Sequence, residues 1–226
     1  MYQLFIANKN YSSWSLRPWV LLRQLGIPFE EKLVPFGGPA DFFGFSPSGK
    51  VPCLMDGRTV VWDSLAITEY LAERHPGVWP LDSGARAWAR CAAAEMHSGF
   101  FDLRGSCTMN CGVRVKLKSI SSGLQNDLAR LDALWTEGLA RYGGPFLAGP
   151  AFTAVDAFFA PVAFRLQTYG LELSAPALDY AGRLRALAPL QDWYAAALAE
   201  PWRDAEHEAE IAQLGTLLQD LRAPRT

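Results

Sequence analysis

The sequence is poor in the residues that build disulfide frameworks and metal sites. Among its 226 residues there are only four cysteines and three histidines, and no two cysteines have the Cys-x-x-Cys spacing of a zinc or redox motif. A chain of this length buries enough surface to fold without disulfides. We therefore expect no metal and four reduced thiols that serve as small apolar side chains: Cys53, Cys91, Cys107 and Cys111.

An excess of charge and a long apolar run are also missing. The 21 Lys and Arg residues nearly balance the 23 Asp and Glu residues, and the net charge of −2 argues against a nucleic-acid-binding protein. No uninterrupted apolar run approaches the roughly 20 residues of a membrane span. Residues 1–7 are too short an apolar stretch for a signal peptide. The composition predicts a cytoplasmic protein whose partners include neither nucleic acid nor a membrane.

What the sequence does contain is an ordered series of strand and helix patterns in its first 80 residues. Residues 2–7 are a short run of strand formers, and residues 16–25 have helical spacing that stops before Gly26. An extended stretch follows at residues 29–35. Because this strand–helix–strand unit is short, it predicts two parallel strands joined by a crossover helix.

A second unit follows a loop at residues 34–48, which is rich in Gly, Pro and Phe and has room for at most one helical turn. Residues 51–55 and 59–62 are strand patterns around an Asp-Gly pair, which is typical of a β-hairpin. An amphipathic helix is expected over residues 64–74. The order β-α-β, loop, β-β-α is typical of a thioredoxin-like α/β domain.

The rest of the chain has helical patterns. The Pro- and Gly-rich stretch at residues 76–80 is the candidate linker. We predict a thioredoxin-like α/β domain over residues 1–80 packed on an all-helical domain over residues 85–226. Helices of the second domain are expected at residues 85–101, 124–139, 153–169, 178–187, 190–198 and 204–221.

The motif V-P-C-L at residues 51–54 places a proline within a strand pattern. A proline there belongs at an edge or a turn because it removes a ladder donor. A cis Val51-Pro52 bond would present the backbone N–H and C=O of Val51 to an extended peptide, which could pair with them as an added strand. The alternative is a trans proline that opens a strand.

Asp63-Ser64 stands directly before the expected helix at residues 64–74. We expect Ser64 to be the N-cap, and the residue three positions later is an isoleucine that cannot complete a capping box. Free N–H groups in the first turn could then bind a carboxylate, while Asp63 holds an ammonium. The pair suits the head group of an α-amino acid, and helix capping alone is the alternative.

The densest cluster of hydroxyl groups is S-S-W-S at residues 12–15, in the turn where a thioredoxin-like redox protein would carry Cys-x-x-Cys. A serine hydroxyl cannot exchange disulfides, but it can donate a hydrogen bond to the thiolate of a ligand. The helix N-terminus and Arg17 would lower the pKa of that thiol. Pro18 fits only the first helical turn, which places the predicted N-cap near Trp14 or Ser15. Capping by the serines and a structural ion pair of Arg17 are the alternatives.

The three motifs fit one ligand. The serine turn takes a thiol, the Val51 backbone takes a peptide, and the helix start at Asp63-Ser64 takes an amino acid terminus. A γ-glutamyl-cysteinyl peptide has all three groups. A serine hydrolase is not indicated, because the Gly-x-Ser-x-Gly turn of that class is absent.

In this order and spacing the sequence resembles a glutathione transferase along nearly its whole length. The motifs are S-S-W-S-L-R-P-W, G-K-V-P-C-L-M-D-G, W-D-S-L-A-I-T-E-Y-L and, at residues 152–158, F-T-A-V-D-A-F, in which Thr153 and Asp156 resemble the family's N-capping motif. Residues 12–17 resemble the S-S-C-x-x-R signature of the zeta class (maleylacetoacetate isomerase-like, of bacterial type), with Trp14 in place of the cysteine. The resemblance implies a thioredoxin-like domain joined to a helical domain, glutathione as co-substrate, a homodimer and a role in detoxification.

The resemblance also implies roles for individual residues. Ser12 matches the zeta-class serine and is the lead candidate for the thiol-activating hydroxyl, whereas classes with a serine four positions before the arginine point to Ser13. Val51 would pair with the cysteinyl backbone of glutathione, and Lys50 could reach the glycyl carboxylate. The candidate catalytic residues are Ser12, Ser13 and Arg17, and the candidate glutathione-binding residues are Ser15, Lys50, Val51, Pro52, Asp63 and Ser64.

The stretch at residues 97–110 falls where the family places residues of the second substrate site. Arg104 and Asn110 could face the cleft and bind an acidic substrate, or be surface and capping residues. The predicted activity is conjugation of glutathione to a small electrophile. The alternatives are a glutathione-dependent cis–trans isomerase of the maleylacetoacetate type, a non-catalytic glutathione-binding or ligand-binding protein, and a disulfide or peroxide reductase. The last is disfavoured because Cys53 falls on a strand and not at the helix start.

Overall fold

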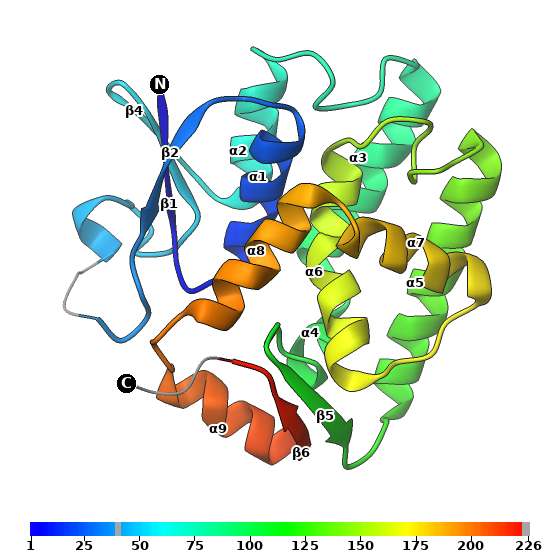
Figure 1. Cartoon of the computed structure of the whole chain (residues 1–226). Helices are drawn as coiled ribbons and strands as arrows, with labels where there is room; N and C mark the ends of the chain where they lie inside the picture. The colour runs from blue at the N-terminus through cyan, green and yellow to red at the C-terminus, as the bar shows by residue number, and fades with distance from the viewer. Residues whose placement is uncertain (39–41, 223–226) are drawn as a thin grey trace.

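A four-stranded mixed sheet forms one side of the molecule in the computed structural model of the chain, which describes residues 1–38 and 42–222 (Figure 1). The strand order is β2-β1-β3-β4. β1 (Tyr2–Ile6) pairs in parallel with β2 (Phe29–Leu33), and α1 (Ser13–Gln24) connects the two strands. The predicted strand–helix–strand unit is therefore confirmed.

The hairpin unit completes the sheet. β3 (Cys53–Asp56) runs antiparallel to both β1 and β4 (Thr59–Trp62), and α2 (Ser64–Ala72) follows. The loop before the hairpin holds one short 3₁₀ turn, η1 (Phe42–Gly44), and its residues 39–41 lie outside the described residues. The thioredoxin-like order of elements is confirmed.

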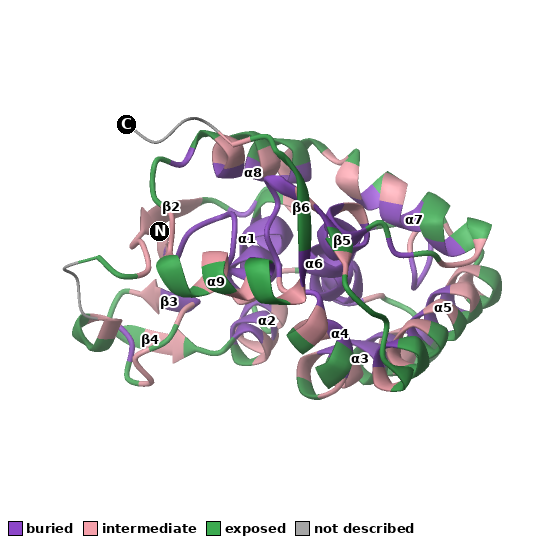
Figure 2. Ribbon diagram, turned by 90° about the horizontal axis from the view of Figure 1, so that it is seen from below, coloured by how far each residue is buried: buried purple, intermediate pink, exposed green. Residues whose placement is uncertain are grey.

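The second domain is built around α6 (Ala154–Tyr169), in which 15 of 16 residues are buried. Figure 2 shows this helix in the middle of the molecule, close to α1, and it contacts α1, α3 and α7. Thr153 and Asp156 form the predicted capping box at its start. No helix of residues 1–38 and 42–222 has the length and apolar character needed to cross a membrane. The other helices are α3 (Ser83–Ser98), α4 (Phe101–Ser106), α5 (Ser122–Tyr142), α7 (Ala175–Arg185), α8 (Ala188–Ala199) and α9 (Ala205–Leu214).

The helical domain also contains a small antiparallel sheet that the sequence patterns do not predict. β5 (Val113–Leu117) pairs with β6 (Gly215–Asp220), so the helix expected over residues 204–221 is wrong beyond Leu214. The helix ends at Gly215, where a Cβ atom would lie 2.5 Å from the carbonyl oxygen of Lys116. Backbone pairing between segments about 100 residues apart overrides the local helical pattern, a tertiary effect that periodicity does not report.

Candidate functional site

Two adjoining cavities lie beside the start of α1: a wide cavity lined by both domains and a narrow cavity lined by residues of the N-terminal domain. The wide cavity has a volume of about 500 Å³ and the narrow cavity about 400 Å³. Both are lined by Trp14, Lys50 and Val51, so a ligand can extend from one into the other. The cavities therefore form one candidate site with two compartments.

The serine turn forms the floor of the wide cavity. Ser12 is the N-cap of α1: its Oγ accepts a hydrogen bond from Ser15 N at 3.4 Å and donates one to Ser15 Oγ at 2.7 Å. The predicted N-cap near Trp14 or Ser15 is wrong. Pro18 is the sixth residue of the helix and is tolerated inside it. Ser15 is fully buried with its Oγ also accepting from Ala7 N, so it supports the turn and does not line either cavity.

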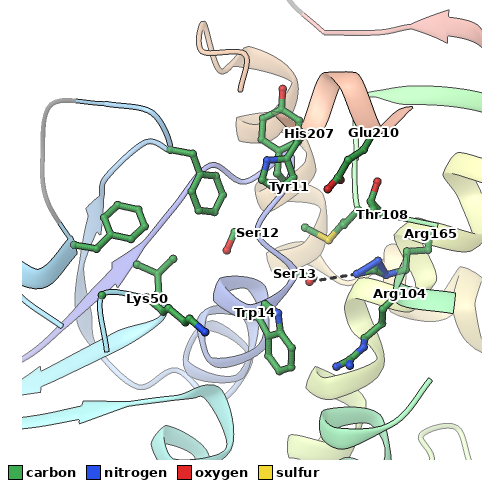
Figure 3. A pocket seen from close by; sticks show the side chains of 15 residues that line it. Tyr11, Ser12, Ser13, Trp14, Lys50, Arg104, Thr108, Arg165, His207 and Glu210 are labelled. Carbon is green, nitrogen blue, oxygen red and sulfur yellow. Dashed lines mark hydrogen bonds between the residues drawn. The ribbon is translucent and has the colours of Figure 1, made fainter. Parts of the chain in front are cut away.

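Ser13 follows as the first residue of α1 and has a different partner. Its Oγ accepts a hydrogen bond from Nη2 of Arg165 at 3.3 Å, and both residues line the wide cavity (Figure 3). Arg165 lies in α6, is only 5% exposed and also donates from Nη1 to the carbonyl oxygen of Cys107 at 2.8 Å. The sequence does not indicate this role of Arg165, because its contact with Ser13 joins residues 152 positions apart.

Asp63 and Ser64 both line the narrow cavity, but their roles in capping α2 differ from the prediction. Asp63, not Ser64, is the N-cap of α2; its Oδ1 accepts from the N–H groups of Leu65 at 2.8 Å and Ala66 at 3.5 Å. Asp63 has φ +74°, a positive value that is uncommon for a residue other than glycine. Its second carboxylate oxygen lies 3.6 Å from Nε2 of His97. The Asp63 charge therefore stays at the cavity while one of its oxygens caps the helix.

Val51, Pro52 and Lys50 also lie at the cavities. The Val51-Pro52 peptide bond is cis. Val51 and Pro52 line the narrow cavity, and Val51 lines the wide cavity as well. Lys50 is exposed and lies at the boundary of the two compartments, where its side chain can reach an anionic group in either. The backbone of Val51 therefore lies between the serine turn and Asp63.

Arg17 is not at the cavity surface. Its guanidinium is buried beneath Trp14, with 4.1 Å to the centre of that ring and 4.8 Å to the ring of Phe158, and it donates to Ser64 Oγ at 3.5 Å. Burial and the repulsion of Arg165 and Arg104 lower the pKa of Arg17 to about 9, against a smaller opposite effect of Asp63. The structural ion pair considered as an alternative for Arg17 is absent among the described residues. The positive charge of Arg17 therefore lies behind the Trp14 ring, close to the cavities but not in contact with them.

Of the two residues predicted for the second substrate, only Arg104 lines the wide cavity. It extends from α4, donates to the carbonyl oxygen of His97 at 3.0 Å and lies 5.5 Å from the ring of Trp14. Asn110 is 1% exposed, accepts from Gly112 N and donates to Glu208, so its role is structural. The prediction for Asn110 as a cavity residue is wrong, because the chain turns it into the interior.

The C-terminal helix supplies a further part of the wall that the sequence reasoning missed. His207 and Glu210 of α9 line the wide cavity, and the His207 ring stacks between Tyr11 and Phe36 at centroid distances of 4.9 and 5.2 Å. Tyr11 in turn donates to Glu208 at 2.7 Å. A stacked ring between two aromatic residues is a tertiary arrangement that no local motif signals.

The site is electropositive. Arg17, Arg104 and Arg165 donate to a hydroxyl or to backbone carbonyls, and no carboxylate of residues 1–38 and 42–222 lies within ion-pairing distance of them. The Nε atoms of Arg17 and Arg165 have no hydrogen-bond partner among the same residues. Uncompensated buried guanidinium groups are costly, so the arrangement favours an anion in the cavity.

No group of three His, Cys, Asp or Glu side chains suited to a metal occurs in the part of the chain that the structure describes.

The sequence matches known proteins in both domains. Residues 11–74 match the glutathione S-transferase N-terminal domain and residues 119–196 match the glutathione S-transferase C-terminal domain. Relatives include a stringent starvation protein A homolog of Haemophilus ducreyi, 24% identical over 69% of this chain and 71% of its own, and a zeta-class glutathione S-transferase of Euphorbia esula, 28% identical over 66% and 70%. A glutathione transferase homolog from a Burkholderia, crystallised with glutathione, shares the fold with a TM-score of 0.67 at 24% identity over 87% of this chain and 97% of that one. The chain belongs to the glutathione S-transferase family.

Proposed function

We propose that the protein is a glutathione transferase that joins the thiolate of glutathione to a small electrophile, the serine-type activity expected from the sequence. The observation that carries the proposal is the arrangement of three motifs around the two cavities. The serine turn, the Val51-Pro52 backbone and the start of α2 at Asp63 follow one another along continuous lining. The family membership and the glutathione in the Burkholderia structure support the same ligand.

Glutathione would lie along this lining with its γ-glutamyl end in the narrow cavity. The second oxygen of the Asp63 carboxylate would hold the ammonium group. The N–H and hydroxyl of Ser64 would hold the ligand carboxylate, because Asp63 already caps the N–H groups of Leu65 and Ala66. The Val51 backbone would pair with the cysteinyl residue in the manner of an added strand. Lys50, at the boundary of the two cavities, would attract the glycyl carboxylate. The cysteinyl sulfur would then lie at the serine turn.

The reaction needs a thiolate at neutral pH, because the thiolate and not the thiol is the nucleophile. The thiol proton would pass to solvent through the open wide cavity. The sulfur electron pair would then form a carbon–sulfur bond as the leaving group departs with the electron pair of the broken bond. The α1 N-terminus, a serine hydroxyl and the nearby guanidinium groups would stabilise the thiolate before the electrophile binds.

Calorimetric titration with glutathione and with cysteinylglycine, which lacks the γ-glutamyl group, tests the binding part of the proposal. We expect glutathione to bind and cysteinylglycine to bind at least tenfold more weakly, because it cannot use Asp63. Conjugation of 1-chloro-2,4-dinitrobenzene tests the chemistry. Binding without turnover of any chlorodinitroaromatic electrophile would favour a non-catalytic protein, and no binding of glutathione would overturn the proposal.

The arginines of the wide cavity favour a second candidate, a glutathione-dependent cis–trans isomerase of the maleylacetoacetate type. Arg104 and Arg165 line the cavity and are not ion-paired with any described carboxylate, so they suit an acidic substrate. The thiolate would add to the double bond, allow rotation and leave again with glutathione regenerated. Isomerisation of maleylacetoacetate at a rate above its conjugation would place this activity first. The homodimer and the cytoplasmic location remain predictions.

A further inference from the structure

The two adjacent serines differ in what their hydroxyl hydrogens do. Ser12 Oγ donates its single hydrogen to Ser15 Oγ at 2.7 Å and accepts from Ser15 N at 3.4 Å. Ser15 Oγ is held in place by Ala7 N at 3.3 Å. The Ser12 hydroxyl is therefore used within the turn, and donating to a ligand would break a buried hydrogen bond.

Ser13 has the opposite arrangement. Its Oγ accepts from Arg165 Nη2, and a guanidinium has donors only, so it cannot accept the Ser13 hydrogen. No other hydrogen bond of the Ser13 hydroxyl occurs among the described residues. The hydroxyl hydrogen must point away from Arg165, and the hydroxyl lines the wide cavity (Figure 3). Ser13 is a donor with its hydrogen free, whereas Ser12 is not.

Arg165 is fixed in a way that suits it to hold Ser13. It is nearly fully buried in the central helix α6, and its second amino group is bound to the carbonyl oxygen of Cys107. Burial, with a smaller repulsion from Arg104, lowers the pKa of Arg165 to about 10, while Tyr169 and Cys107 act in the opposite direction. Arg165 thus remains a cation at neutral pH. A hydroxyl that accepts a hydrogen bond from a cation becomes a stronger donor, since consecutive hydrogen bonds polarise one another.

We propose that Ser13, and not Ser12, donates the hydrogen bond to the glutathione thiolate, and that Arg165 is the positioning residue that orients and polarises the Ser13 hydroxyl. This inference rests on the proposed binding of glutathione with its sulfur at the serine turn. The sequence match alone places Ser12 slightly ahead. The hydrogen-bond directions reverse that order, and they add a residue from the helical domain to the thiol-activating group.

The ultraviolet absorbance of the bound thiolate, followed against pH, tests the inference in the full-length protein. For the wild type we expect a thiol pKa below the free value of about 8.5. S13A should raise it by about 1 to 2 pH units and S13T should restore it, because threonine keeps the hydroxyl. S12A should change it little, although Ser12 is the helix N-cap and its loss lowers stability. R165M should raise the thiol pKa as S13A does.

R185M is the matched control for R165M. Arg185 is also a partly buried arginine that donates to a backbone carbonyl, that of Ala163 in α6 at 2.9 Å, but it does not line either cavity. We expect R185M to leave the thiol pKa unchanged. If Arg165 acts through Ser13, most of the effect of R165M should disappear in the S13A background. R165K, which keeps the charge but loses the planar fork, should fall between wild type and R165M.

The outcomes separate this inference from the proposed function. A lowered thiol pKa in the wild type that S12A abolishes and S13A preserves would overturn the inference and leave the proposed function intact. An unchanged thiol pKa in a folded R165M variant would reject the role of Arg165. Glutathione that does not bind, or that binds to the wild type with an unshifted thiol, would overturn both.

Discussion

The wall of the wide cavity that comes from the N-terminal domain consists mainly of two short runs of the chain, whereas the facing wall is assembled from residues of three separate helices and the loop after α4. The first wall consists of the start of α1 at residues 11–14 and the segment before β3 at residues 49–51, with Phe36 and Phe42 beside them. The facing wall takes Arg104 from α4, Arg165 from α6 and His207 from α9. The first wall is suited to a fixed, polar ligand. The second offers long cationic side chains that can be changed one at a time without altering the sheet.

The largest effect is expected on stability, at the start of α6, because this helix carries Arg165 of the second wall. Asp156 is fully buried and accepts hydrogen bonds from Leu147 N, Thr153 N and Tyr180 OH. Asp156→Ala leaves these donors without a partner, so we expect a loss of about 3 kcal/mol in the free energy of unfolding at neutral pH. Urea unfolding measures it. Asp179→Ala, an exposed position in α7, is the control and should have little effect.

The same variant has a defined pH dependence. Burial, against the hydrogen bonds from Thr153, Leu147 and Tyr180, raises the pKa of Asp156 from 3.8 to about 6. Between these values the folded protein binds the proton more tightly than the unfolded chain, so the contribution of Asp156 to stability falls as the pH rises. The difference between wild type and Asp156→Ala should therefore be larger at about pH 4.5 than at pH 7. A difference that grows toward neutral pH would contradict this assignment.

The next largest effect is expected in the narrow cavity, which adjoins the first wall and is lined by Asp63. Asp63→Asn keeps a capping oxygen and tolerates the positive φ, but it removes the charge proposed to hold the ammonium group of glutathione. We expect glutathione to bind about 2 kcal/mol more weakly, roughly thirtyfold, with kcat nearly unchanged. Initial rates at varied glutathione measure KM and kcat. Asp56→Asn, on the β3–β4 hairpin and outside both cavities, should leave KM unchanged.

A tenfold effect on substrate preference is expected from Arg104 of the second wall. If Arg104 receives an anionic group of the electrophile, kcat/KM for 4-chloro-3,5-dinitrobenzoate should exceed that for the matched benzamide by about tenfold, and Arg104→Gln should remove the preference. Arg141→Gln changes an exposed arginine of α5 paired with Glu137 and should preserve it. An equal preference in Arg104→Gln and wild type would mean that Arg104 only packs against Trp14 and His97.

These two walls also divide what the sequence could and could not predict. The serine turn, the Val51-Pro52 backbone and Asp63 all line the two cavities, and each belongs to a motif a few residues long in which local chemistry fixes the conformation. Within those motifs the detail was wrong: Asp63 and not Ser64 caps α2, and Arg17 lies beneath Trp14 and not at the surface. Local patterns do not report which way a long side chain turns.

Sequence patterns indicate little of the second wall, for a different reason. Arg165 lies in a helix that is buried on every side, so helical periodicity gave it no distinct face. Its proposed role depends on its hydrogen bond to Ser13, 152 positions earlier in the chain. The sheet of β5 and β6 is not predicted because its strands are nearly 100 residues apart and Leu217 and Leu218 are exposed. One signal was available: a buried helix that carries a single arginine indicates that something in the interior must receive its charge.

The smallest effect is expected for Lys50, which lies at the boundary of the two compartments and is exposed. An exposed lysine attracts an anion weakly because water screens the charge. We expect Lys50→Ala to raise the KM for glutathione only about threefold, and added salt at about 0.5 M to reduce that difference further. Lys116→Ala, an exposed lysine of β5, should have no effect at either salt concentration. A large increase in KM that salt does not reduce would instead mean that Lys50 becomes buried against the ligand. Lys50 would then be a specific contact of the first wall and not a solvent-screened charge.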